Sequence, residues 1–182
     1  MKVVYRYSHL GGYEILKVNY PEILDEIYDV VSKVVANKTK VSREKTNPGT
    51  MLYSPIDMNA QFKDHFNAIG YTEIRDHFDI VLPETEAVVA KAFKQVDFQK
   101  EDVLIEVQFG KYAFMFYDVA KFQYFFNENR AKVGVEIVPC HRLHKSMSTG
   151  VSYGEQLIFD IERLKRHFPA VPVMVLLVDI DD

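Results

Sequence analysis

Apolar residues recur along the chain at two different periods, which predict helices and strands in alternation. From Pro21 onward the apolar residues are three and four positions apart, a spacing typical of a helix with one buried face. Proline suits the start of that helix because the first helical position needs no N–H donor. A further helix is expected over Pro83–Lys94, whose acidic start and basic end suit the helix dipole. Other helices are expected over Met58–Ala68, Tyr112–Asn127 and Tyr153–His167.

The remaining apolar segments have the pattern of strands. Val103–Phe109 alternates, with Val103, Ile105 and Val107 on one face and Glu106 on the other. Val171–Ile180 is almost continuously apolar, which is typical of a strand buried on both faces. Further strands are expected over Val3–Tyr7, Val96–Phe98 and Val133–Val138. The alternation predicts an α/β fold with a central mixed β-sheet flanked by helices.

Composition narrows the class of protein. The chain has 182 residues, of which 48% are hydrophobic and 26% charged, which excludes wholesale disorder and suits a single domain over residues 1–182. A single cysteine, Cys140, excludes an internal disulfide and favours a reducing, cytoplasmic setting. No stretch approaches the roughly 18 apolar residues of a membrane span, and Met1–Tyr7 lacks the apolar core of a signal peptide.

A net charge of −4 does not by itself indicate a nucleic-acid binder, so any DNA-binding charge must be local. The segment Lys38–Thr50 carries four basic residues against Glu44 alone, and Arg130–Lys145 carries four against Glu136 alone. A third basic cluster, in the last predicted helix, consists of Arg163, Lys165 and Arg166. Such clusters could contact phosphates, although each is equally consistent with a solvated surface.

The candidate chemistry lies in the centre of the chain. Glu106 and Gln108 are two residues apart and therefore project from the same face of a strand. Asp97 precedes them across a polar turn, so a hairpin would bring it beside Glu106. Two adjacent carboxylates repel each other, and a divalent cation such as Mg²⁺ between them would relieve that repulsion. From spacing alone the pattern is weak, and an ordinary half-exposed strand with one glutamate is the favoured interpretation.

The wider sequence resembles the BglII/BstYI group of type II restriction endonucleases, in the PD-(D/E)xK nuclease superfamily, and is most similar to its BstYI branch. The central match runs from Asp97-Phe98 to Ile105–Tyr112, with Gln108 where the superfamily usually has lysine. The similarity covers most of the chain in order and is poorest over Asp76–Gln95. The other matching segments are Tyr7–Glu14, Ser42–Thr46, Leu52–Pro55, Val133–Pro139, Met147–Tyr153 and Pro169–Pro172.

The resemblance implies a restriction-endonuclease-like fold and a role for each motif residue. Asp97 and Glu106 would hold Mg²⁺, and Gln108 would orient the attacking water, because an amide cannot act as a base at neutral pH. An upstream polar residue, usually on a helix, completes such sites, and Glu73 is the candidate, although a solvated surface glutamate is equally plausible. The products would be 5′-phosphate and 3′-hydroxyl ends.

The resemblance also implies where DNA sequence is read. Lys111, just after the catalytic strand, and a loop holding Ser148, Thr149 and Ser152 would reach base edges in the major groove. Lys111 could instead be a solvated charge, and Ser152 could instead cap the next helix with Glu155. Ser152 is therefore the weaker candidate.

The family acts as a homodimer on palindromic sites with a GATC centre, cut before it to leave a four-base 5′ overhang. The expected site is purine-GATC-pyrimidine, and a cognate DNA methyltransferase is the expected functional partner. The helices over Tyr112–Asn127 and Tyr153–His167 are the expected dimer helices, because their aromatic content suits an apolar interface, although a buried core would have the same sequence.

Two alternatives remain open from the sequence. The chain could be a sequence-specific DNA-binding dimer that does not cleave, although Asp97 and Glu106 argue against it. It could also be a structure-selective repair or recombination nuclease of the same superfamily, although such enzymes lack a base-reading loop like Ser146–Ser152. A zinc site at Cys140, His141 and His144 is disfavoured because no fourth ligand lies nearby in the sequence.

Overall fold

A six-stranded sheet runs through the computed structural model of the chain, which describes residues 1–43, 45 and 48–180. The strand order is β1-β8-β7-β6-β5-β4, with β6, β7 and β8 parallel and the outer pairs antiparallel. The sheet is therefore mixed, as the sequence predicts. Its strands are β1 (Lys2–His9), β4 (Thr72–Val81), β5 (Val88–Lys100), β6 (Val103–Val107), β7 (Val133–Pro139) and β8 (Val173–Asp179).

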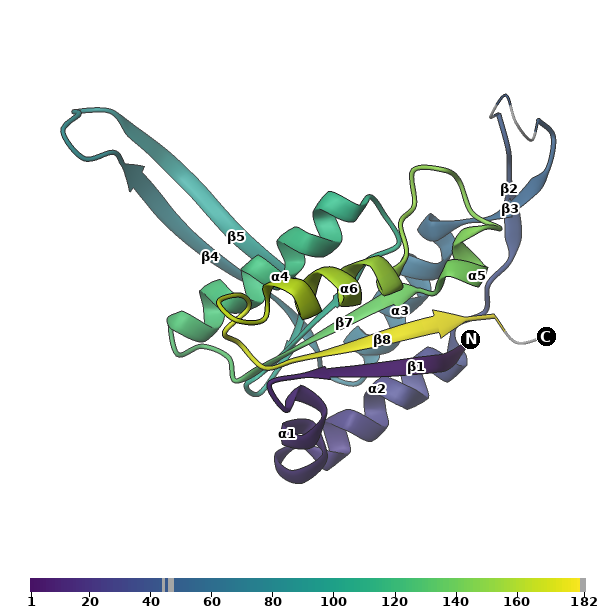
Figure 1. Cartoon of the computed structure of the whole chain (residues 1–182), viewed down its shortest axis with the longest axis horizontal. Helices are drawn as coiled ribbons and strands as arrows, with labels where there is room; N and C mark the ends of the chain where they lie inside the picture. Colours follow the sequence, from purple (N-terminus) through teal and green to yellow (C-terminus); the bar gives the residue numbers. More distant parts are fainter. Residues whose placement is uncertain (44, 46–47, 181–182) are drawn as a thin grey trace.

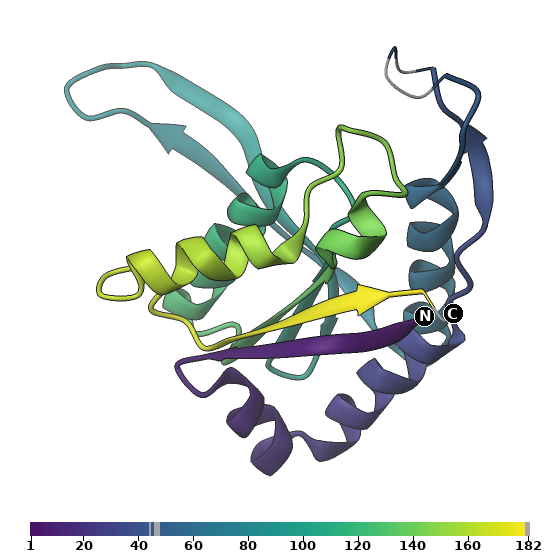
Figure 2. The ribbon, with the colours of Figure 1, turned by 45° about the vertical axis from the view of Figure 1, so that its right-hand side comes forward.

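Helices cover both faces of this sheet (Figures 1 and 2). One face carries α1 (Gly12–Asn19), α2 (Pro21–Lys33) and α3 (Pro55–Ala68). The other carries α4 (Tyr112–Asn127) and α6 (Gly154–Leu164). The short helix α5 (His141–His144) follows β7, and a two-stranded sheet joins β2 (Lys38–Val41) to β3 (Met51–Tyr53). None of the described helices is long and apolar enough to cross a membrane.

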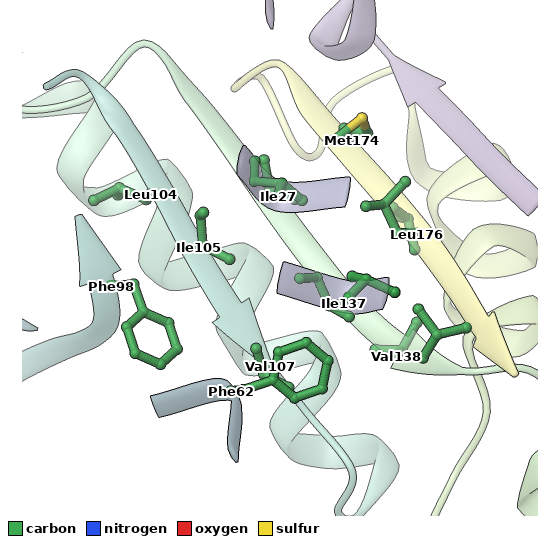
Figure 3. Close-up of a cluster of buried hydrophobic side chains, with 14 of the residues drawn as sticks. Ile27, Phe62, Phe98, Leu104, Ile105, Val107, Ile137, Val138, Met174 and Leu176 are labelled. Atoms are coloured by element: carbon green, nitrogen blue, oxygen red, sulfur yellow. The ribbon is translucent and has the colours of Figure 1, made fainter. Parts of the chain in front are cut away.

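The core is centred on the three parallel strands, whose residues are buried along their whole length. Figure 3 shows Ile105 and Ile137 on adjacent strands, with Ile27 of α2 and Phe62 of α3 lying against this face. Burying large apolar side chains contributes about 1.5–3 kcal/mol each. The central strands are thereby fixed in position, and the polar groups on their other face are held with them.

Most predicted elements are confirmed, including α2 and the full length of α4. The helix predicted over Pro83–Lys94 is wrong, because this segment belongs to the hairpin of β4 and β5, which projects from the body (Figure 1). Its charge gradient is worth only about 0.3–1 kcal/mol to a helix. Cross-strand pairs such as His77 with Phe93 give the same residues a continuous backbone ladder instead.

Three local expectations also differ from the structure. The polar loop after β7 contains α5, and Ser152 does not cap α6. The capping residue is Tyr153, and the Glu155 carboxylate accepts hydrogen bonds from the backbone N–H of His141 at 2.9 and 3.0 Å. The predicted basic loop forms β2 and β3, and three of its residues lie outside the described part of the chain: Glu44, Thr46 and Asn47.

Helix α1 passes against the backbone of β8 at Gly12, which leaves no room there for a side chain. A Cβ at position 12 would lie 2.4 Å from the carbonyl carbon of Val173. Backbone cannot move aside cheaply, so Gly12→Ala should lower the free energy of unfolding by about 1–3 kcal/mol in urea denaturation. Gly150→Ala is the matched control, because nothing lies within 4 Å of its added Cβ. Equal stability of the two variants would contradict this packing.

Candidate active site

Asp97 and Glu106 lie side by side where β5 and β6 pair. The strands are antiparallel and their last pair is Phe98 with Ile105, so Asp97 and Glu106 are the residues just beyond it, on the opposite face of the sheet, where the charge of Asp97 acts on Glu106. Glu106 is buried, whereas Asp97 is exposed and lines a cleft of about 510 Å³. One carboxylate therefore opens to solvent and the other lies beneath it, as the predicted hairpin requires.

Helix α4 places Asp118 and Lys121 over Glu106. Lys121 Nζ forms ion pairs with both Glu106 Oε1 and Asp118 Oδ1, the latter at 2.7 Å. Asp118 and Glu106 are each only 2% exposed. The lysine is therefore shared between two buried carboxylates.

Glu136 adds a further buried carboxyl group to this face. It is paired with Glu106 in the parallel ladder of β6 and β7 and is fully buried. Among the described residues, neither of its side-chain oxygens has a hydrogen-bond partner. Burial raises the pKa of Glu136 well above its ordinary value, and the nearby charges of Asp118 and Glu106 raise it further.

The pKa values of the two other buried carboxyl groups, Glu106 and Asp118, are shifted in the same direction. Burial, followed by repulsion from Asp118 and Asp97, raises the pKa of Glu106 well above its ordinary value. Burial also raises the pKa of Asp118, although Lys121 opposes the shift. Burial alone would lower the pKa of Lys121, but its two carboxylate partners outweigh burial and raise it. The site therefore holds more carboxyl groups than Lys121 can neutralise, and the raised pKa values show that these groups favour binding a proton or another cation.

Gln108 follows β6 directly, and the sheet fixes its backbone. Its N–H donates to the carbonyl of Ile137 at 2.9 Å. Its side-chain Nε2 donates to Asp118 Oδ2 at 3.0 Å, so the amide lies between the end of the strand and α4. Gln108 therefore joins the face that holds Glu106, as its spacing predicts.

Glu73 lies on β4 rather than on a helix, yet it lines the same cleft as Asp97. Its carboxylate accepts a hydrogen bond from Gln95 Nε2 at 2.6 Å and pairs with Arg75 at 3.1 Å. The structure thus brings Glu73 to the cleft, but with its carboxylate already engaged by neighbours on the hairpin.

Of the four predicted DNA-reading residues, Lys111 follows shortly after β6, and Ser152 ties the loop that holds the other three to the same segment. Lys111 and Thr149 are exposed, Ser148 is half-buried and Ser152 is buried. The N–H of Ser152 donates to the carbonyl of Gly110 at 2.8 Å, which ties the loop to the segment just after Gln108. On its other side, the loop accepts a hydrogen bond from Lys40 of β2 at Ser148 Oγ, at 3.1 Å.

The sequence patterns did not identify three residues that lie around Glu106: Asp118, Lys121 and Glu136. The signal for the first two is their helical spacing with Phe122 and Phe125, which are fully buried. Charged residues on an apolar helix face are rare unless they are paired. The signal for Glu136 is a lone carboxylate within an apolar strand.

The carboxylates around Glu106 suit a divalent cation bound at Asp97, where the cluster meets solvent. Among the described residues, no three histidine, cysteine, aspartate or glutamate side chains meet in a geometry that would hold a metal ion alone. Mg²⁺ commonly uses one or two protein carboxylates and completes its shell with water and substrate phosphates. Asp97 and Glu106 would supply such a pair, and the raised pKa of Glu106 shows that its surroundings favour added positive charge.

Comparisons with known proteins identify a family and a fold for this chain. A family model described as restriction endonuclease BglII/BglIII matches residues 4–178. The crystal structure of restriction endonuclease BglII complexed with a DNA 16-mer matches with a TM-score of 0.77 and 22% identity, over 100% of this chain and 78% of that one. The crystal structure of free BglII matches with a TM-score of 0.69 and 20% identity, over 100% and 81%. No curated protein sequence matches the chain.

The buried Glu136 predicts a pH-dependent difference in stability. A raised pKa in the folded state means that its stabilising contribution is present at low pH and is lost as pH rises through that pKa. Gln cannot titrate, so the unfolding free energy of Glu136→Gln relative to wild type should rise as pH increases above the ordinary glutamate pKa of about 4.5, by at most about 1.4 kcal/mol per pH unit.

Urea denaturation in EDTA at several pH values measures this difference. Glu86→Gln, at an exposed glutamate in the hairpin loop, is the matched control and should follow the wild-type pH curve. Wild-type and Glu136→Gln curves that stay parallel across the range would show that Glu136 titrates normally.

Proposed function

The chain belongs to the BglII/BglIII restriction endonuclease family and is a type II site-specific deoxyribonuclease, and on this premise we propose that Asp97, Glu106 and Gln108 form its DNA-cleaving centre. One observation carries the proposal. Asp97 and Glu106 are adjacent across β5 and β6 at the edge of a cleft, and Gln108 follows on the same face. This arrangement supports in-line hydrolysis of a DNA phosphodiester to 5′-phosphate and 3′-hydroxyl ends.

Asp97 and Glu106 would hold the divalent cation, which we propose to be Mg²⁺. When bound, the cation would polarise the phosphodiester and lower the pKa of a bound water. The chain's own part is to keep Glu106 rigid beneath the site and Asp97 open to the cleft. Glu73 lines that cleft too, and we propose that it completes the active site from β4.

Gln108 would orient the attacking water. Its amide cannot accept a proton at neutral pH, so it acts through hydrogen bonding alone. Its position at the end of a buried strand supports this role, because that strand holds the amide at a fixed distance from Glu106.

Sequence recognition would come from Lys111 and the loop that holds Ser148, Thr149 and Ser152. Lysine can donate to guanine O6 and N7, and hydroxyls can donate or accept. Ser152 is the weakest of the four because it is only 8% exposed. The resemblance to the BglII/BstYI group supports a purine-GATC-pyrimidine site, cut to leave a four-base 5′ overhang.

A homodimer would place one such centre on each strand of a palindrome. Aromatic side chains remain exposed on the two helices that we propose as the dimer interface: Phe114 on α4 is 54% exposed and Phe159 on α6 is 56% exposed. Both helices lie on one face of the sheet, which would give a continuous contact surface (Figure 2).

We also propose a single domain and a cytoplasmic setting for this enzyme. Residues 1–182 would act as a single endonuclease domain, since strands from both ends of the chain share the main sheet. The enzyme would meet double-stranded DNA in the cytoplasm. A cognate DNA methyltransferase would protect host sites as a functional rather than physical partner.

Incubation with a long DNA of known sequence tests the proposed function. We expect discrete fragments with Mg²⁺ and none with EDTA, and end sequencing should show cuts before GATC. A smear, or cutting confined to branched DNA, would favour a structure-selective nuclease. Tight binding without cutting would favour a non-cleaving DNA-binding dimer.

Asp97→Asn separates binding from chemistry. The amide removes the charge that would hold the cation, so cleavage should fall by at least about 10-fold, while site-specific binding in EDTA should stay near the wild-type level. The matched control is Asp25→Asn, at an exposed aspartate on α2, which should cleave as wild type does. Full activity of Asp97→Asn in a gel time course would rule out Asp97 as a cation ligand.

A further inference from the structure

Asp118 of α4 is buried against the proposed catalytic strand, and no proposed catalytic step uses it. Its two carboxylate oxygens have different partners. Oδ2 accepts from Gln108 Nε2 at 3.0 Å, and Oδ1 accepts from Lys121 Nζ at 2.7 Å. Lys121 also pairs with Glu106, so one buried chain of contacts joins Gln108, Asp118, Lys121 and Glu106.

This contact decides which way the Gln108 amide faces. The amide nitrogen and oxygen have nearly the same shape, but the nitrogen only donates and the oxygen only accepts. A carboxylate only accepts, so Asp118 selects the nitrogen and turns the oxygen to the other side. Lys121 holds Asp118 in this acceptor role among its acidic neighbours Glu106, Asp97 and Glu136.

Gly110 leaves the space that the amide oxygen fills. A Cβ at position 110 would lie 2.4 Å from Gln108 Oε1, which is closer than real Cβ contacts allow. Gly110 therefore makes room for the amide at this position, and the hydrogen bond from its nitrogen to Asp118 sets which of its two ends faces Gly110.

The orientation matters for a water nucleophile. The water attacks phosphorus with a lone pair, so its hydrogens need acceptors and that lone pair must stay free. A glutamine oxygen accepts one of those hydrogens, whereas a glutamine NH₂ would donate to the lone pair that must attack. The wrong amide orientation would therefore oppose the reaction while leaving the shape of the site unchanged.

We propose that Asp118, held by Lys121, is a positioning residue that fixes the Gln108 amide with its oxygen turned toward the attacking water. This inference rests on the proposed function. Asp118 itself touches neither the DNA nor the water, and it acts only through Gln108.

Asp118→Asn tests the proposal, because asparagine has the same shape but can present its own NH₂ and permit the flipped amide. We expect the single-turnover cleavage rate with Mg²⁺ to fall about 10–100-fold, with DNA binding in EDTA unchanged within about 2-fold. In a Gln108→Ala background, adding Asp118→Asn should change the rate by less than about 2-fold. An equal loss in both backgrounds would mean a merely structural role and would overturn the proposal.

Gly110→Ala approaches the same amide from its other side and is a second variant should Asp118→Asn fold poorly. Its added Cβ must displace Gln108 Oε1, so it should also slow cleavage, and only when Gln108 is present. The same loss without Gln108 would overturn the inference. Urea denaturation of each variant separates slow cleavage from lost folding.

A metal-free and DNA-free readout completes the test. In protein labelled with ¹⁵N-glutamine, the side-chain NH₂ signal that disappears in Gln108→Ala should exchange slowly with water, and Asp118→Asn should shift it and speed its exchange. An unchanged NH₂ signal in Asp118→Asn would overturn this inference and leave the proposed function standing. A wild-type cleavage rate in Asp118→Asn would do the same. A wild-type protein that cuts no DNA overturns the proposed function, and the inference falls with it.

Discussion

The structure depends on placing several carboxylates on one buried face around a single lysine. Glu106 and Glu136 are neighbours on parallel strands, Asp118 faces them from α4, and only Lys121 carries positive charge among these four residues. Such a group is costly to bury unless something offsets its charge. The fully buried central strands supply the rigidity that keeps these side chains together, and Asp97 gives the group an opening to solvent.

The same region also connects the proposed recognition loop to the proposed catalytic strand. Gly110 lies two residues beyond Gln108, and its carbonyl accepts the N–H of Ser152. Ser148, in the same loop, is held by Lys40 of β2. A shift of this loop on binding DNA would act directly on the backbone beside Gln108. Base reading and bond cleavage would therefore be mechanically linked through one short segment of backbone.

Sequence patterns predicted what local spacing and neighbouring residues determine. The full length of α4 and the pairing of Asp97 with Glu106 follow from helical spacing and from a short turn between strands. The pattern failed over Pro83–Lys94, because pairing with a distant strand outweighs a weak charge gradient. Asp118 was missed as a site residue because its contact with Gln108 is made by the packing of a helix on a sheet, which spacing along the chain does not reveal.

The proposed function depends on a divalent cation binding at Asp97 and Glu106. Paramagnetic broadening by Mn²⁺ in ¹⁵N-labelled protein without DNA tests it most directly. Amide signals on β5 and β6 around these two residues should broaden first, and the broadening should be lost in Glu106→Gln but kept in Glu86→Gln. Broadening centred elsewhere, or equally strong in Glu106→Gln, would contradict it.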